Sequence, residues 1–201
     1  MRIAIDGNIG SGKTFYLNKL QNEGYIVNHE DISKWSQWLQ KYHSDMNRYA
    51  LGFQLQILYD QTQLPYKPSQ LNIYERSPYT LKNIFGDMLF EEQLFDKQEY
   101  ELHNLYVKKI GWKPDVVIYL YCDPDICYER IKDRLSVAGD NQLTVDYLKK
   151  LHIKHEIVFD DLNCSIPIYK VNSMEDTETV YNTIVEIIET LKKNQPALNS
   201  A

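Results

Sequence analysis

The sequence is poor in cysteine, in positive charge and in long apolar runs. Its three cysteines, Cys122, Cys127 and Cys164, are odd in number and have neither metal-binding nor redox-motif spacing. We therefore expect reduced thiols in a cytoplasmic compartment, although an organellar mature form also fits. Lysine and arginine number 22 against 28 aspartates and glutamates, a net charge of −6, which argues against a nucleic-acid partner bound through phosphate contacts. Only a short apolar run lies between Arg2 and Asp6, so we expect no signal peptide, no bilayer-spanning segment and no membrane partner.

Internal repeats and low-complexity segments are also missing, and 201 residues suit one α/β domain. Apolar runs alternate with amphipathic segments, which predicts a five-stranded parallel sheet with helices on both faces. The expected strands are the run before Gly7 and residues 25–29, 71–75, 116–121 and 166–171; the expected helices are 14–21, 35–42, 48–63, one starting at Pro78, 91–110, one starting at Pro124, 144–162 and 177–193. The domain is expected to cover 1–195, with a flexible lid at about 130–142 and a disordered tail at 196–201.

A glycine-rich turn follows the first apolar run. Its sequence, GNIGSGKT, matches the pattern G-x-x-x-x-G-K-[ST] between an expected strand and an expected helix, the context that distinguishes a phosphate-binding loop from an ordinary turn. The glycines let backbone N–H groups close around phosphate oxygens, Lys13 adds charge for the β and γ phosphates, and the Thr14 hydroxyl can ligate Mg²⁺. The predicted ATP-binding residues are Gly7, Asn8, Ile9, Gly10, Ser11, Gly12, Lys13 and Thr14.

Three further groups of charged residues lie at or beyond expected strand ends: Glu30, the segment 75–77, and the pair Arg130 and Arg134. Sites of open α/β sheets gather at the carboxyl ends of the strands, and phosphoryl transfer needs a carboxylate, a metal partner and cations. The spacing of the two arginines, i and i+4, is equally typical of a solvated helix face. The guanine signature N-K-x-D and an ABC-type signature are missing, which disfavours switch GTPases and transporter ATPases.

Six segments, taken together in their order and spacing, resemble the deoxyribonucleoside kinase family. They are GNIGSGKT at 7–14, HEDISKW at 29–35, GFQ at 52–54, ERSPYT at 75–80, YERIKDR at 128–134 and YLKKLHIKHE at 147–156. The resemblance covers nearly the whole chain. It implies a P-loop kinase fold with an arginine-bearing lid, a homodimer, and ATP-dependent phosphorylation of a deoxyribonucleoside 5′-hydroxyl in nucleotide salvage.

The resemblance also implies a chemical role for each matching charged residue. Glu30 is the expected general base, and Arg76 is expected beside the reacting oxygen. Glu75 would support the Mg²⁺ shell together with the threonine of the P-loop. Arg130 and Arg134 would close from the lid onto the ATP phosphates, so these residues and the P-loop lysine make up the expected catalytic set.

The nucleoside contacts implied by the resemblance fall on a different set of residues. Gln54 is expected to pair with the base edge, Phe85 to stack on the base, and Trp35 to form a wall of the pocket. Tyr42 and Glu156 are expected to hold the 3′-hydroxyl.

Some positions leave alternatives open. Asp31 stands beside Glu30 where family members often have proline, so either carboxylate could be the base. The match near Tyr42 needs a one-residue gap, which makes His43 a second candidate for the sugar contact. His155 falls on the apolar stripe of its helix, and the order H-x-x-H-E is not a zincin motif, so we expect a core histidine rather than a metal ligand.

The pocket residues also bear on the base. Where members that prefer deoxycytidine or purines have an aspartate and an arginine, this chain has Leu81 and Gln61, as in the thymidine-preferring branch. We therefore expect thymidine first, deoxycytidine second and purines poor. The alternatives are a nucleoside monophosphate kinase resembling thymidylate kinase, whose charged acceptor would call for extra arginines instead of a carboxylate base, and a non-catalytic P-loop nucleotide sensor.

Overall fold

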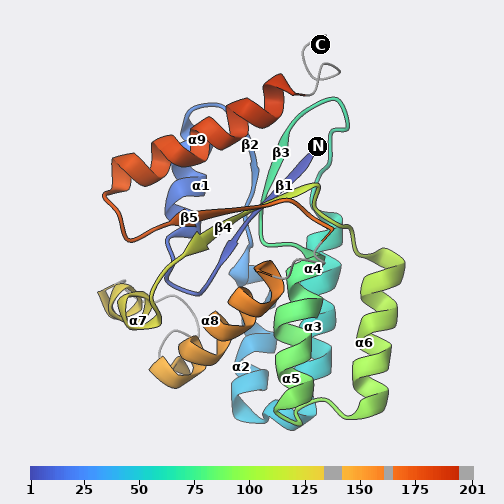
Figure 1. Ribbon diagram of the computed structural model, residues 1–201. Coiled ribbons are helices and arrows are strands. Elements are labelled where there is room, and N and C mark those ends of the chain that lie inside the picture. The colour runs from blue at the N-terminus through green and yellow to red at the C-terminus, as the bar shows by residue number, and fades with distance from the viewer. Residues whose placement is uncertain (134–141, 161–164, 195–201) are drawn as a thin grey trace.

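Five strands form one all-parallel sheet in the order β2-β3-β1-β4-β5, as Figure 1 shows for the computed structural model. The structure describes residues 1–133, 142–160 and 165–194. The strands are β1 (Arg2–Gly7), β2 (Ile26–Asn28), β3 (Asn72–Glu75), β4 (Val116–Tyr121) and β5 (Ile168–Asn172). Strand β1 lies in the centre, paired with β3 on one side and β4 on the other. The predicted parallel α/β sheet is confirmed.

Helices cover both faces of this sheet (Figure 1). They are α1 (Lys13–Asn22), the 3₁₀ helix η1 (Ile32–Trp35), α2 (Ser36–Ser44), α3 (Met46–Gln63), α4 (Pro78–Thr80), the π-helical segment η2 (Leu81–Gly86), α5 (Asp87–Glu91), α6 (Lys97–Ile110), α7 (Pro124–Asp133), α8 (Val145–Phe159) and α9 (Thr177–Lys193). Within the described ranges, no helix has both the length and the apolar character needed to cross a bilayer.

The two faces of the sheet are buried by different helices because successive strand residues point to opposite sides. Ile3, Ile5 and Ile118 pack with apolar residues of α1 and α9. Ala4 lies between Ile3 and Ile5 in sequence, and Val117 directly precedes Ile118. Both pack with residues of η2, α5 and α8. Central strands buried on both faces explain the nearly continuous apolar runs in the sequence.

One expected helix boundary is wrong. The segment 91–110 is not one helix, because α5 ends at Glu91 and α6 begins only at Lys97. A capping box sets this start: Asp96 Oδ1 accepts from the Glu99 backbone N–H at 2.8 Å, and the Glu99 carboxylate accepts from the Asp96 N–H at 2.9 Å. This reciprocal pair satisfies N–H groups that a helix start leaves free.

A second difference lies after Pro78, where the sequence predicts one regular helix. The chain instead winds more widely through η2 before it returns to α-helical geometry in α5. Such π insertions are frequent at functional sites, and η2 carries both Leu81 and Phe85. Several expectations lie outside the described residues: Arg134 with lid residues 134–141, Cys164, and the tail from residue 195.

Candidate active site

The P-loop is fixed in shape by glycines at its two ends and in its middle. Gly7, Gly10 and Gly12 have φ of 143°, 85° and 96°, a region that residues with a Cβ rarely adopt. A Cβ on Gly7 would lie 2.6 Å from the Leu120 carbonyl oxygen, and one on Gly10 would lie 2.4 Å from the Cys127 carbonyl oxygen. The loop is therefore wedged between β4 and α7, with no room for side chains on that side.

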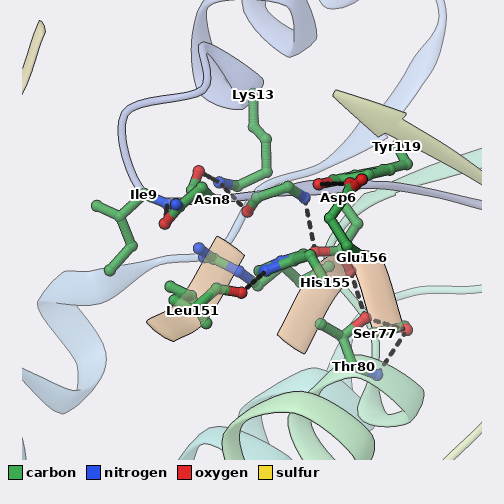
Figure 2. A network of polar contacts seen from close by, with 12 residues as sticks. Asp6, Asn8, Ile9, Lys13, Ser77, Thr80, Tyr119, Leu151, His155 and Glu156 are labelled. Atoms are coloured by element: carbon green, nitrogen blue, oxygen red, sulfur yellow. Dashed lines mark hydrogen bonds and ion pairs between the residues drawn. The ribbon is translucent and has the colours of Figure 1, made fainter. Parts of the chain in front are cut away.

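Lys13 opens helix α1 and reaches back across the loop. Its Nζ donates to the carbonyl oxygens of Gly7 at 3.0 Å and Asn8 at 2.8 Å (Figure 2). Burial, helped by the positive charge of Arg76, lowers the pKa of Lys13 to about 8. The ammonium group is thus held at the centre of the loop by two neutral carbonyl oxygens. A bound phosphate can replace them with negatively charged oxygens, which are stronger partners.

A buried ion pair joins the ends of β2 and β3. Arg76 Nη1 donates to Glu30 Oε2, and the two side chains are only 10% and 11% exposed. Burial and the neighbouring charge of Glu75 raise the pKa of Glu30, against the opposing effect of Arg76. Arg76 has a φ of 61°, a left-handed conformation that is uncommon for a non-glycine residue.

Asp31, the other carboxylate at this position, has a different environment. Its side chain is 49% exposed, and its Oδ1 accepts from the Ser33 backbone N–H at 3.1 Å. It is the N-cap of η1. The geometry therefore brings Glu30, and not Asp31, against Arg76.

Thr14 and Glu75 meet at the mouth of the P-loop. Thr14 Oγ1 donates to Glu75 Oε1 at 2.8 Å, and His29 Nδ1 lies 3.8 Å from Glu75 Oε2. Burial raises the pKa of Glu75, but His29, Lys13 and other donors outweigh it, and the pKa is lower than usual. A hydroxyl and an ionised carboxylate are ligands that suit Mg²⁺. The described part of the chain holds no cluster of three or more His, Cys, Asp or Glu that could bind a metal.

A cavity of about 1180 Å³ extends from the P-loop to helix α3. Most of the predicted site residues line it: Gly10, Gly12, Lys13, Thr14, Glu30, Trp35, Tyr42, Gln54, Glu75, Arg76, Phe85 and Arg130. Phe53 packs between two of them, with its ring centroid 5.3 Å from Trp35 and 5.2 Å from Tyr42. His43 also lines the cavity, so the geometry leaves both Tyr42 and His43 as candidates for the sugar contact.

Two glutamines on α3 face the far end of the cavity. Gln54 and Gln61 are each 5% exposed and are seven residues, or two helical turns, apart. Oε1 of Gln54 and both amide atoms of Gln61 have no hydrogen-bond partner within the described residues. Leu81, which is 3% exposed, lines the same cavity. Buried amides without partners are costly, so this end of the cavity suits a flat ligand with hydrogen-bonding edges.

Arg130 reaches the cavity from α7. Its Nη2 donates to the Ser173 carbonyl oxygen at 2.9 Å, and its Nη1 lies 3.4 Å from Cys122 Sγ. One guanidinium edge is therefore held by the ends of β4 and β5, at the same side of the sheet as the P-loop.

Glu156 is the predicted substrate-binding residue that the structure does not bring into the cavity. Its Oε1 accepts from the Tyr119 hydroxyl and its Oε2 from Lys170 Nζ, both at 2.7 Å, and it is not among the residues that line the cavity. The expected contact with the 3′-hydroxyl is therefore corrected: Glu156 braces α8 against β4 and β5. The side chain turns to the sheet because its helix packs there.

Sequence reasoning missed other residues of the cavity wall. Glu92 lines it and accepts from Lys150 Nζ at 2.6 Å, which joins the end of α5 to α8. Tyr147 lines it as well. Tyr147 could have been found, because it lies in the segment YLKKLHIKHE, which carries part of the family resemblance. Nothing in the local sequence distinguishes Glu92 from its neighbour Glu91.

A P-loop at the carboxyl end of the central strand, facing a buried carboxylate and arginine, defines a P-loop phosphotransferase. Residues 3–193 match the sequence model of the deoxynucleoside kinase family, and the chain belongs to that family. It is a kinase that phosphorylates deoxynucleosides, with ATP as the phosphate donor.

Similarity to individual proteins runs over most of the chain. It is 32% identical over 192 residues to putative kinase protein 029R of Invertebrate iridescent virus 3, covering 94% of this chain and 96% of the viral protein. It is 32% identical over 188 residues to probable deoxycytidine kinase FPV151 of Fowlpox virus, covering 87% of this chain and 80% of that one. The solved structure of deoxyadenosine kinase from M. mycoides has the same fold, with a TM-score of 0.81 at 21% identity over 96% of this chain and 100% of that one.

Proposed function

We propose that the chain transfers the γ-phosphoryl group of ATP to the 5′-hydroxyl of a pyrimidine deoxyribonucleoside in nucleotide salvage, and that thymidine is its best substrate. The observation that carries this proposal is one cavity with two chemically different ends. The P-loop and the Glu30–Arg76 pair line one part of its wall, and Oε1 of Gln54 and both amide atoms of Gln61, which have no hydrogen-bond partner within the described residues, line another. This arrangement suits a nucleoside whose base is held far from the phosphates and whose 5′-hydroxyl reaches the carboxylate.

In the proposed reaction, Glu30 accepts the proton of the 5′-hydroxyl as that oxygen attacks the γ-phosphorus. Its raised pKa makes it a better base than an ordinary glutamate. Arg76, bonded to Glu30, orients the carboxylate and stabilises the charge that develops on the transferred group. Lys13 exchanges its two carbonyl partners for the β and γ phosphates.

Magnesium fits the same site. Thr14 and Glu75, which are joined at 2.8 Å, would hold it, and the ion would neutralise charge on the β- and γ-phosphate oxygens. Arg130 would add positive charge from the α7 side.

The preference for pyrimidines is inferred from three side chains. The Gln54 amide offers an acceptor and donors for the pairing edge of thymine or cytosine. Leu81 cannot accept from an exocyclic amino group, and its bulk restricts a two-ring base. It can pack against the thymine methyl, a contact of about 0.8 kcal/mol. Of the three relatives described above, two are named for a base, one for deoxycytidine and one for deoxyadenosine, so the base preference of this chain has to be measured.

The test is kcat/KM for the four deoxynucleosides and for thymidine monophosphate, with ATP in excess. We expect thymidine first, deoxycytidine second, both purines poor, and thymidine monophosphate inert. A purine that outruns thymidine would refute the Leu81 argument. Faster phosphorylation of the monophosphate than of thymidine would establish a nucleotide kinase instead.

A designed pair of variants sharpens this test. Leu81→Asp combined with Gln61→Arg introduces one negative and one positive charge into the cavity wall, and we expect it to move the preference from thymidine toward deoxycytidine. Leu81→Met is the matched control, because it keeps an apolar side chain of similar volume and should keep the order of substrates. An unchanged order in the double variant would remove these two residues from the account of specificity.

A further inference from the structure

A fully buried polar contact between β1 and α8 lies beside the P-loop (Figure 2). His155 of α8 and Asp6 of β1 are both 0% exposed, and His155 Nε2 lies 3.5 Å from Asp6 Oδ1. The imidazole stacks on Tyr119 of β4, with ring centroids 5.8 Å apart and planes 10° from parallel. The catalytic steps described above do not use either residue.

The contact of His155 with its own helix decides which ring nitrogen faces Asp6. Its Nδ1 lies 2.7 Å from the Leu151 carbonyl oxygen, which can only accept, so Nδ1 carries a proton. Nε2 then faces a carboxylate, which in its ionised form also only accepts. Burial raises the pKa of Asp6, but the hydrogen bond and charge of His155 and the charge of Arg76 outweigh it, and the pKa falls below its usual value. The contact thus sets the ring Nε2 against an ionised carboxylate at ion-pair distance.

Asp6 connects His155 to the P-loop. The same Oδ1 that faces His155 accepts from the backbone N–H of Gly7 at 2.8 Å, and Oδ2 accepts from the Thr80 hydroxyl of α4. Gly7 is the first residue of the P-loop, and its carbonyl oxygen holds Lys13 Nζ. A rotation of the Asp6 carboxylate would therefore turn the peptide unit on which the loop begins.

A second contact ties the same helix to the next residue of the loop. Asn8 Nδ2 donates to the Leu148 carbonyl oxygen at 2.9 Å, while Asn8 Oδ1 accepts from the Ile9 backbone N–H at 2.9 Å. Helix α8 thus holds the P-loop from behind at two points, two turns apart.

We propose that His155 is a positioning residue for ATP binding, which acts through Asp6 to hold the P-loop in its phosphate-binding shape. It does not line the cavity, and its main effect is on the donor side, because Asp6 precedes Gly7 and bonds to the Gly7 backbone N–H at the start of the loop. The residue is therefore more than the core histidine that its position on an apolar stripe indicates.

The experiment measures ATP binding by calorimetry, in the presence of Mg²⁺ and without nucleoside, together with KM for ATP and for thymidine. His155→Phe keeps the stacking on Tyr119 but removes the ring nitrogen that faces Asp6. We expect its Kd and KM for ATP to rise about tenfold, as for the loss of one buried polar contact, while KM for thymidine stays unchanged. His155→Gln, which can place an amide N–H toward Asp6, should recover most of the ATP affinity.

His152→Phe is the matched control, since it makes the same change one turn earlier on α8, where the ring contacts Tyr121 at 5.3 Å and not the loop. It should bind ATP as the unchanged protein does. The inference rests on the proposed function only in taking ATP as the phosphate donor. ATP binding measured without nucleoside tests the role of His155 even if the acceptor is not a nucleoside.

Three results would overturn the proposal. A folded His155→Phe protein with unchanged ATP affinity would do so. So would losses of ATP and thymidine affinity that are the same in His155→Phe as in His152→Phe. If His155→Phe does not fold, His155→Gln decides: a folded Gln variant that binds ATP as weakly as a P-loop lysine variant would refute positioning through Asp6.

Discussion

Replacing Glu30 by glutamine tests the central step of the proposed reaction. The carboxylate is 11% exposed and bonded to Arg76. Glutamine has the same shape and still offers an oxygen to the guanidinium, so the pair loses its negative charge but not its packing. The variant removes the proton acceptor and leaves the cavity wall in place.

The expected loss is in turnover. General-base catalysis contributes about 10²–10⁴-fold, which corresponds to about 2.7–5.5 kcal/mol of barrier. We therefore expect kcat to fall by at least about 10² and KM for thymidine to stay within about threefold, the mark of an interaction made in the transition state. Initial rates of ADP release at saturating ATP give both constants.

The pH profile gives an independent reading. Because the pKa of Glu30 is raised above 4.5, its protonation should lower kcat/KM of the unchanged enzyme at a higher pH than an ordinary glutamate would. Activity falls as pH decreases, since only the ionised form accepts a proton. This fall of activity at low pH should be missing from the residual activity of Glu30→Gln.

Asp31→Asn is the control, because it changes the neighbouring carboxylate, which is half-exposed and caps η1. Its kcat should stay within about twofold, as for most exposed substitutions. Near-normal turnover in Glu30→Gln, combined with a large loss in Asp31→Asn, would transfer the role of base to Asp31.

Further predictions concern other parts of the molecule. Lys13→Ala should lower kcat/KM by at least about 10² through lost charge stabilisation, with an unchanged circular dichroism spectrum; normal activity would refute the P-loop assignment. Glu156→Gln should leave KM for thymidine within about twofold and cost about 1 kcal/mol of stability or less, measured by denaturant titration, and a large rise in KM would restore its expected sugar contact. The homodimer stays a prediction, and light scattering should then give about twice 23.8 kDa.

The sheet could be predicted from sequence because parallel strands buried on both faces leave continuous apolar runs. Strand β4 and helix α9 have the predicted ends, 116–121 and 177–193. The P-loop was recognisable for a similar reason, since its glycines are required by backbone geometry and not by distant contacts.

Long-range packing decided what the sequence could not show. Nothing in the local pattern of 81–86 predicts a π segment, and Glu156 looks like any helix-surface acid until α8 docks on β4 and β5. The same docking turns His155 from a member of an apolar stripe into a partner of Asp6. The family resemblance assigned the catalytic candidates, but the packing of α8 decided which of its polar residues face the cavity.

The left-handed backbone at Arg76 has a consequence for how this protein balances stability against activity. A non-glycine residue in that region costs about 1–2 kcal/mol, so the fold gives up stability at the position from which the guanidinium reaches Glu30. Selection for stability alone would favour glycine there, and glycine would remove the charge. Thermal robustness and the role proposed for Arg76 are thus opposed at a single φ angle, and a stabilised version of this enzyme has to gain its stability elsewhere in the chain.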